Sequence, residues 1–231
     1  IDKKIDWTPV YSLTENEFKY LPSGYCYAQY PAEDEKKLFS YPDSNGCAAG
    51  NTLEEAILQG FLEMVERAAA AIWWYNRIQN PDLETVNNTY VNQMFDHYKA
   101  IDRSLCVLDI TTELGIPVFV AVSHNIKEDE NDQILYAFGA HIDAEIALER
   151  AVIELNQLLP VVMSDDKGYL TSDKVFVDWL ETAKLKDNAY LEPIKDVKKS
   201  MKTDYPKLCE PNLYDSIQFC IETVKKQGLE T

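Results

Sequence analysis

The sequence predicts a mixed α/β fold in which a mostly antiparallel sheet packs against long helices. Three β-rich runs follow one another closely, at residues 105–111, 117–123 and 134–140, which is the pattern of a meander. Because these runs are almost continuously apolar, helices are expected to cover the sheet on at least one face. Two long helical segments, beginning near residues 51 and 143, can supply that cover.

The segment before the first long helix carries few regular signals. Residues 1–43 mix aromatics with prolines and a charged patch. They predict short strands at about Tyr25–Tyr30 and Leu38–Tyr41, joined by loops.

The first long helix is predicted from Asn51 to about Arg77. Asn51 is expected to cap it, while Glu54 reaches back to complete a capping box. Trp73 and Trp74 near its end could stack on an adenine. Packing in the core or at an interface is the favoured interpretation, because adjacent aromatic side chains cannot all face one ligand.

The later elements complete the α/β pattern. A second helix is predicted over about Leu83–Tyr98, with Asp82 as its cap. Beyond the sheet and the helix that follows Asp143, further helices are predicted at about Ser172–Ala183 and Leu213–Gln227.

Composition excludes several classes of protein. The 231 residues, 46% of them hydrophobic, can bury a sizeable core and are most simply one domain. A net charge of −17 would repel a phosphate backbone, so nucleic acid is not an expected partner. No stretch approaches the roughly 20 apolar residues of a membrane span. The five cysteines are odd in number and show no CxxC spacing, which argues against a disulfide framework or a zinc site and favours a reducing cytoplasm.

Polar residues of the first long helix gather on one face. At about 100° per residue they share with Asn51 an arc of about 160°, and apolar residues fill most of the remaining circumference. These polar residues are Glu55, Gln59, Glu63, Glu66 and Arg67. Without a counter-charge, each of three clustered carboxylates on a buried helix would destabilise the fold by roughly several kcal/mol. We therefore expect Glu66→Gln to leave stability unchanged or to raise it.

A divalent cation can neutralise this face. Carboxylate and amide oxygens suit Mg²⁺, which bridges to substrate phosphates. Arg67 and the helix N-terminus behind Gly46 and Gly50 would then face those phosphates. The alternative is the solvated face of an ordinary amphipathic helix. Cys47 in the preceding loop could be a nucleophile, although a small buried filler is the favoured interpretation.

The helix after Asp143 repeats this arrangement. Arg150, Glu154 and Gln157 lie on one face at i, i+4 and i+7. Taken alone, this pattern is typical of an exposed salt-bridged face.

The order and spacing of these residues resemble a known motif. Ser44, Asn51, Glu55, Gln59, Glu63, Glu66 and Arg67 fill every position of the ATP-binding motif of the YcaO-domain family. The flanking SNG, AGNT and IWWYNR segments look most like the SagD-like peptide cyclodehydratase branch. Residues 108–123 and 138–157 are also similar to family segments, so that the resemblance spans about residues 6–160.

The resemblance implies a YcaO-like fold and ATP-dependent activation of peptide amides. A Cys, Ser or Thr side chain of a precursor peptide would be cyclised to a thiazoline or oxazoline, as in bacteriocin-like peptide biosynthesis. The implied cofactors are ATP and Mg²⁺. The implied ATP contacts are Ser44, Asn51, Gln59, Arg67, Arg150 and Gln157. The implied metal ligands are Glu55, Glu63, Glu66 and Glu154. No general base or other catalytic residue is assigned.

Departures from the family pattern set the remaining expectations. The upstream Ser-x3-Glu-x2-Glu-Arg motif and the proline-rich tail of cyclodehydratases are not found, and the chain opens with Ile1. Residues 1–231 are therefore expected to be a single YcaO-like domain of a longer protein, inactive alone. The expected partners are the precursor peptide and a leader-binding protein or fused domain, with a homodimer left open. The alternatives are another amide activation, such as thioamidation, and a non-catalytic docking scaffold.

Overall fold

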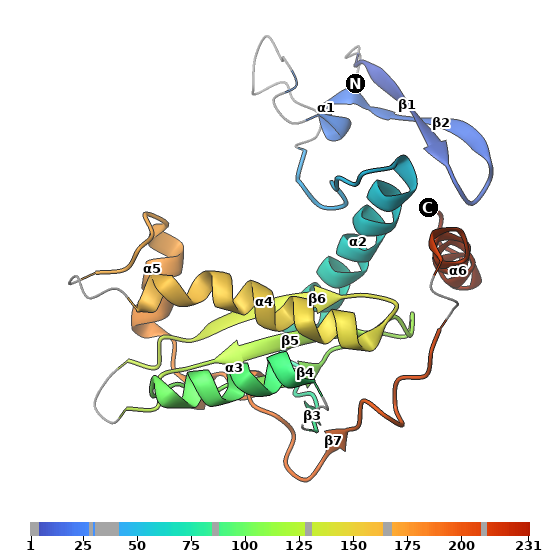
Figure 1. Cartoon of the computed structure of the whole chain (residues 1–231). Coiled ribbons are helices and arrows are strands. Elements are labelled where there is room, and N and C mark those ends of the chain that lie inside the picture. Colours follow the sequence, from blue (N-terminus) through green and yellow to red (C-terminus); the bar gives the residue numbers. More distant parts are fainter. Residues whose placement is uncertain are drawn as a thin grey trace. The chain divides into compact units, whose positions relative to one another are not determined.

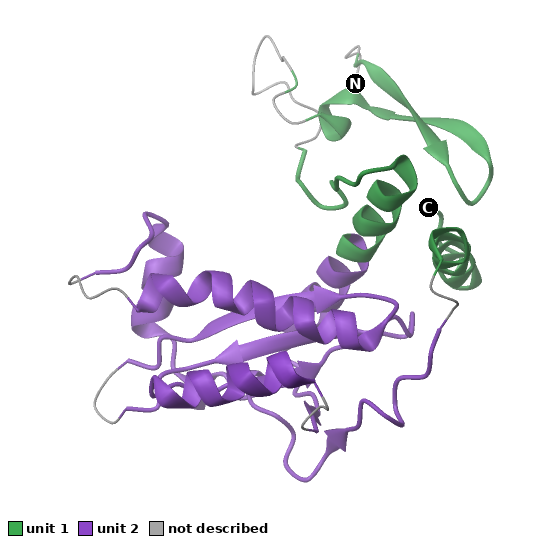
Figure 2. Cartoon of the chain, viewed as in Figure 1, with its two compact units in different colours: residues 1–63, 209–231 green, residues 64–208 purple. Residues whose placement is uncertain are grey.

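A computed structural model of the chain describes residues 5–27, 30, 42–84, 88–127, 131–163, 168–208 and 212–231. The chain divides into two compact units, residues 1–63 with 209–231 and residues 64–208 (Figure 2). Helices and mostly antiparallel strands confirm the mixed α/β prediction. Within the described ranges, no helix combines the length and the apolar character needed to cross a membrane. The expectation of a single domain stays a prediction.

The first unit begins with a β-hairpin that the sequence analysis missed. Strands β1 (Trp7–Ser12) and β2 (Glu17–Pro22) pair antiparallel, and the short helix α1 (Ser23–Cys26) follows (Figure 1). The predicted strand at Tyr25–Tyr30 is therefore wrong over its first residues, which are helical. The predicted strand at Leu38–Tyr41 lies outside the described residues.

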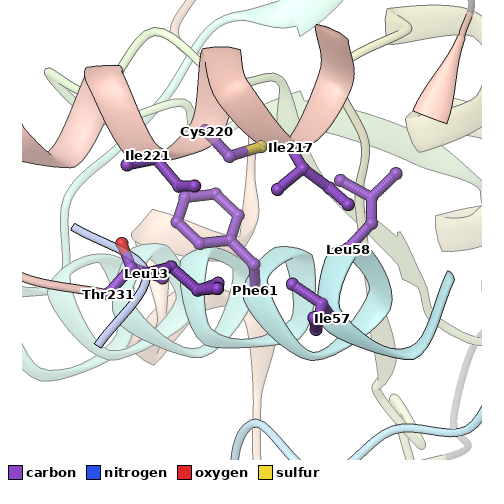
Figure 3. A pocket seen from close by; sticks show the side chains of 8 residues that line it. All are labelled: Leu13, Ile57, Leu58, Phe61, Ile217, Cys220, Ile221 and Thr231. Carbon is purple, nitrogen blue, oxygen red and sulfur yellow. The ribbon is translucent and has the colours of Figure 1, made fainter. Parts of the chain in front are cut away.

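Two helical segments of the first unit pack through apolar side chains. They are the beginning of α2 (Leu53–Asn76) and α6 (Leu213–Lys226). Figure 3 shows Phe61 of α2 among Ile217, Cys220 and Ile221 of α6, around a small apolar cavity. Cys220 is only 1% exposed, so its thiol serves as core packing.

The second unit contains a five-stranded sheet in the order β6-β5-β4-β3-β7. Strands β4 (Cys106–Asp109), β5 (Val118–Ser123) and β6 (Leu135–Ala140) form an antiparallel meander, as predicted. The strand β3 (Asp82–Leu83) pairs antiparallel with β4 and parallel with β7 (Lys198–Lys199).

The second helix starts later than predicted. The α3 helix covers Thr89–Ala100, and Asn88 caps it by accepting a hydrogen bond from the Val91 amide at 3.1 Å. Asp82, the predicted cap, is a strand residue paired with Leu108. Sheet pairing therefore outweighed the local helix signal at this position.

Helices cover both faces of this sheet. On one face, α3 and α4 (Ala144–Val162) enclose a core that includes Phe119, Leu135 and Ala137 (Figure 1). On the other face, the end of α2 places Trp73 against Phe138 and Tyr190, with ring centroids 5.8 and 5.2 Å apart. Trp73 is 1% exposed, which agrees with the packing interpretation of the tryptophans.

The remaining elements of the second unit follow α4. They are α5 (Lys174–Thr182) and two 3-10 turns, η2 (Leu185–Asp187) and η3 (Ala189–Leu191). The α5 and α6 helices lie within two residues of their predicted bounds.

Candidate functional site

The candidate residues divide between the two units. The first unit holds Ser44, Asn51, Glu55, Gln59 and Glu63. The second unit holds Glu66, Arg67, Arg150, Glu154 and Gln157.

The start of α2 is capped by different residues from those predicted. Thr52 Oγ1 accepts a hydrogen bond from the Glu55 amide at 3.2 Å, and Glu55 Oε2 accepts one from the Asn51 amide at 2.7 Å. Thr52 therefore takes the role predicted for Asn51, and Glu55 takes the role predicted for Glu54. The Glu55 carboxylate thus already holds a backbone N–H of the glycine-rich loop.

That loop packs directly on the acidic face of α2. The Glu63 carboxylate accepts a hydrogen bond from the Gly46 amide. Gly46 has a φ of +79°, a conformation that favours glycine. A Cβ atom on Gly60 would lie 2.6 Å from the Gly46 carbonyl oxygen, so only a glycine admits the loop here.

Cys47 and Ser44 lie in the same glycine-rich loop. The Cys47 amide donates to the Ser44 carbonyl at 3.0 Å, which closes the turn. Cys47 itself is exposed, so its interpretation as a buried filler is wrong. Ser44 is exposed as well.

Gly60→Ala should destabilise the protein, although alanine normally stabilises an exposed helix by about 1 kcal/mol relative to glycine. The added Cβ would meet the Gly46 carbonyl, and such overpacking costs about 1–3 kcal/mol. Thermal unfolding checks the sign, and hydrogen exchange at the Gly46 amide checks whether the loop has moved. Ala68→Ser, which adds an atom at an exposed position of the same helix, is the control. A higher melting temperature for Gly60→Ala would contradict the close contact.

In the second unit, the Glu66 carboxylate lies beside two arginines. Its side chain is 13% exposed, and Arg67 Nη2 lies 3.8 Å from Glu66 Oε1. Burial lowers the pKa of Arg150, and the Glu66 charge opposes that shift. Arg150 Nη1 also donates to the Ala140 carbonyl at 3.1 Å. Glu66 therefore has counter-charges within its own unit, so the repulsion expected from the sequence does not describe it.

Glu66→Gln should consequently lower the free energy of unfolding by about 1–3 kcal/mol, because it removes the carboxylate beside a partly buried guanidinium. This reverses the expectation drawn from the sequence. Chemical denaturation measures the change, and Glu181→Gln, an exposed carboxylate on α5, should remain within about 0.5 kcal/mol of the parent. A neutral or stabilising Glu66→Gln would restore the repulsion interpretation.

The α4 candidates differ in their surroundings. Glu154 Oε2 accepts a hydrogen bond from the Phe138 amide at 3.0 Å. Phe138 belongs to β6, the edge strand of the sheet as described, so Glu154 satisfies a backbone donor for which the described residues provide no neighbouring strand on that side. Gln157 is exposed. Two residues of the polar face predicted on α4, Arg150 and Glu154, therefore bond to the backbone of β6.

His141 is a residue that the sequence analysis gave no role at this site. Burial lowers its pKa, and the positive charge of Arg150 lowers it further. His141 Nδ1 accepts a hydrogen bond from the Asp143 amide at 2.9 Å, at the start of α4. A single histidine after a strand carries no sequence signal of this proximity to Arg150.

The donor set suits magnesium and phosphate. Among the described residues, no three His, Cys, Asp or Glu side chains already converge where they could hold a metal ion. Nevertheless, the carboxylates are hard oxygen ligands of the kind that Mg²⁺ prefers, and the arginines are suited to phosphate oxygens. The loop backbone at Gly46 comes close to α2 because Gly60 of this helix lacks a Cβ. The site assignments stay predictions.

Comparison with known proteins identifies a family that matches the whole chain and relatives that match parts of it. A family model described as YcaO cyclodehydratase, ATP- and Mg²⁺-binding, matches residues 1–231. An uncharacterized protein of Methanothermobacter thermautotrophicus is 26% identical over 160 residues, which are 68% of this chain and 42% of that protein. A protein from the tfuA 3′ region of Rhizobium leguminosarum bv. trifolii is 32% identical over 127 residues, 49% of this chain and 30% of that protein.

Solved structures extend the comparison. A heterocyclase in complex with substrate and cofactor is 43% identical with a TM-score of 0.91, and the match covers 98% of this chain and 30% of that one. The heterocyclase TruD is 41% identical with a TM-score of 0.86, over 98% of this chain and 31% of its own. A protein from Methanopyrus kandleri bound with AMPPCP and Mg²⁺ shares the fold at 23% identity and a TM-score of 0.70, over 96% of this chain and 56% of its own. The chain thus spans less than half the length of the two curated relatives and about 30% of the two heterocyclases.

Proposed function

The chain belongs to the YcaO family, whose members bind ATP and Mg²⁺, and we propose that the full-length protein activates peptide backbone amides with ATP. A Cys, Ser or Thr side chain of a precursor peptide attacks the preceding carbonyl carbon. Mg·ATP supplies the phosphoryl group that converts the former carbonyl oxygen into a leaving group. The attack closes a five-membered ring, and the thiol or hydroxyl proton is released. Loss of the former carbonyl oxygen as phosphate, together with the amide proton, then forms the C=N bond of the thiazoline or oxazoline.

One observation carries this proposal. The match to a heterocyclase complexed with substrate and cofactor extends over 98% of this chain at 43% identity. All seven positions of the motif from Ser44 to Arg67 are filled by residues of the expected type. The match supports azoline formation over other amide activations, and the filled motif supports ATP-dependent catalysis over a scaffold without catalysis.

The proposed contacts follow from the chemistry of the side chains. Carboxylates serve as magnesium ligands and neutralise the charge that develops on the transferred phosphoryl group. They are Glu55, Glu63, Glu66 and Glu154. The remaining polar residues orient phosphate oxygens and the nucleotide. They are Ser44, Asn51, Gln59, Arg67, Arg150 and Gln157.

The proposal includes partners and a setting. A precursor peptide is the substrate, and a leader-binding protein or fused domain delivers it in the cytoplasm. Bacteriocin-like peptide biosynthesis is the proposed context. A homodimer, and the inactivity of residues 1–231 alone, stay predictions.

Mass spectrometry of a precursor peptide tests the function. The full-length protein, its delivering partner, Mg·ATP and a Cys-containing precursor should yield a product lighter by one water for each ring, with one ADP formed per ring. Replacing the cysteines by alanine should abolish both the mass loss and the coupled ADP. A product that exchanges oxygen for sulfur when sulfide is supplied would indicate thioamidation. No product and no ADP from a folded protein would favour the scaffold.

A further inference from the structure

A guanidinium in the second unit, that of Arg103, is buried among neutral hydrogen-bond partners. Arg103 is 4% exposed and lies just before β4. Its Nε donates to Ser123 Oγ at 3.0 Å, and its Nη2 donates to the Gln133 carbonyl at 2.7 Å and to the Ser123 carbonyl at 3.4 Å. These partners are all neutral, and within the described part of the chain no ion pair joins Arg103 to an acid. Burial lowers the pKa of Arg103 to about 10, so the side chain remains charged at neutral pH.

The third nitrogen of this guanidinium, Nη1, has no hydrogen-bond partner among the described residues. Arg103 also lines a solvent-open cavity of about 180 Å³. Arg103 is more than nine-tenths buried and has an N–H donor beside the cavity that no described residue uses. An anion in the cavity would accept a hydrogen bond from this donor and would supply a negative charge to pair with the guanidinium.

The rest of the cavity wall defines the chemistry of the anion. Lys127 adds a second positive charge, which Asp102 at 3.7 Å offsets in part. Gln133, which has a φ of +45°, accepts a hydrogen bond from Arg103 through its backbone carbonyl and also lines the cavity. The remaining lining residues are the polar Asn125 and the apolar Ile101, Val162 and Met163.

We propose that this cavity, bounded by Arg103, Lys127 and Gln133, binds a carboxylate carried on a short apolar stem. The size of the cavity supports a single group, since pockets for whole small molecules usually exceed about 300 Å³. The mixed wall supports a carboxylate on an aliphatic stem over a fully polar phosphate. The source is an acidic side chain of a peptide or a free short-chain carboxylic acid. This inference does not depend on the proposed amide chemistry.

Titration of the protein with isobutyrate is the direct test. Isobutyrate should shift the NMR signals of the Arg103 guanidinium and the Met163 methyl group saturably. The neutral isostere isobutyramide should bind at least about tenfold more weakly, because it cannot form charge-assisted hydrogen bonds as a carboxylate does. Lys127→Met should weaken binding by about twofold to fivefold, and Lys99→Met, an exposed lysine on α3, should not change it. A peptide with an internal glutamate, tested against its glutamine counterpart, separates the peptide source from the free acid.

Several outcomes would overturn the assignment. Equal affinity for isobutyrate and isobutyramide would show that the cavity binds the apolar stem and does not recognise the carboxylate charge. Saturable binding of inorganic phosphate without isobutyrate binding would show that the wrong class of anion was inferred. Arg103→Met should abolish isobutyrate binding. Gln133→Leu keeps the guanidinium and its backbone contacts and should weaken binding, so it provides the test if Arg103→Met does not fold. Unchanged affinity in both Lys127→Met and Gln133→Leu would place the carboxylate elsewhere.

Discussion

Replacing Glu63 with glutamine in the full-length protein should lower Mg·ATP turnover at least about tenfold. Removal of one charge that stabilises phosphoryl transfer removes at least about 1.4 kcal/mol of transition-state stabilisation. Glutamine keeps an oxygen that can still accept the hydrogen bond from the Gly46 amide, so the loop contact survives. The substitution therefore separates the charge of Glu63 from its structural hydrogen bond. Steady-state ADP release at several Mg²⁺ concentrations measures the effect.

The matched control is Glu54→Gln in the same helix. Glu54 is exposed in the first turn of α2 and lies off the acidic arc, so turnover should remain within about twofold of the parent. Part of the loss in Glu63→Gln should be recovered at high Mg²⁺, because a weakened ligand set binds the ion less tightly. Unchanged turnover in a folded Glu63→Gln protein would remove Glu63 from the metal ligands.

Complete burial made one strand of the sheet easy to predict from the sequence. Strand β5 is buried at all six positions, and its continuous apolar run leaves no ambiguity about its place in the sheet. The β1-β2 hairpin gave no such signal, because large side chains such as Trp7 and Phe18 are 56% and 68% exposed. Its strands also contain or end at prolines, which weaken a strand prediction.

At the candidate site, the sequence predicted the residues but not their partners. Helical periodicity placed Glu63 and Glu66 on one arc, since that geometry is local. The groups that neutralise them lie elsewhere in the chain: the Gly46 amide meets Glu63, and Arg150 lies beside Glu66. Phe138 similarly meets Glu154 only because the edge of the sheet faces α4. Such pairings depend on tertiary packing, so the expectation for Glu66→Gln drawn from the structure has the opposite sign to the one drawn from one helix alone.

Helix α4 approaches β6 so closely at Gly139 that no side chain fits between them. A Cβ atom there would collide with the Ala147 carbonyl and the Ala151 amide, both backbone groups of α4, and would lie 2.9 Å from the Arg150 Cβ. Backbone atoms in the middle of a helix cannot rotate away, so α4 would have to move as a whole. Because Arg150 and Glu154 both lie on α4 and bond to β6, they would move with it.

Gly139→Ala should therefore lower the free energy of unfolding by about 3 kcal/mol or more, at the upper end of overpacking effects. For a chain of this size the melting temperature should fall by roughly 6–12 °C. Gly168→Ala is the matched control, because a Cβ there meets nothing within 4 Å. In the full-length protein, Gly139→Ala should also reduce ATP turnover at temperatures where the variant is still folded, since it displaces Arg150. Normal stability would show that α4 can move away from the sheet, and normal turnover in the folded variant would remove Arg150 from the proposed nucleotide contacts.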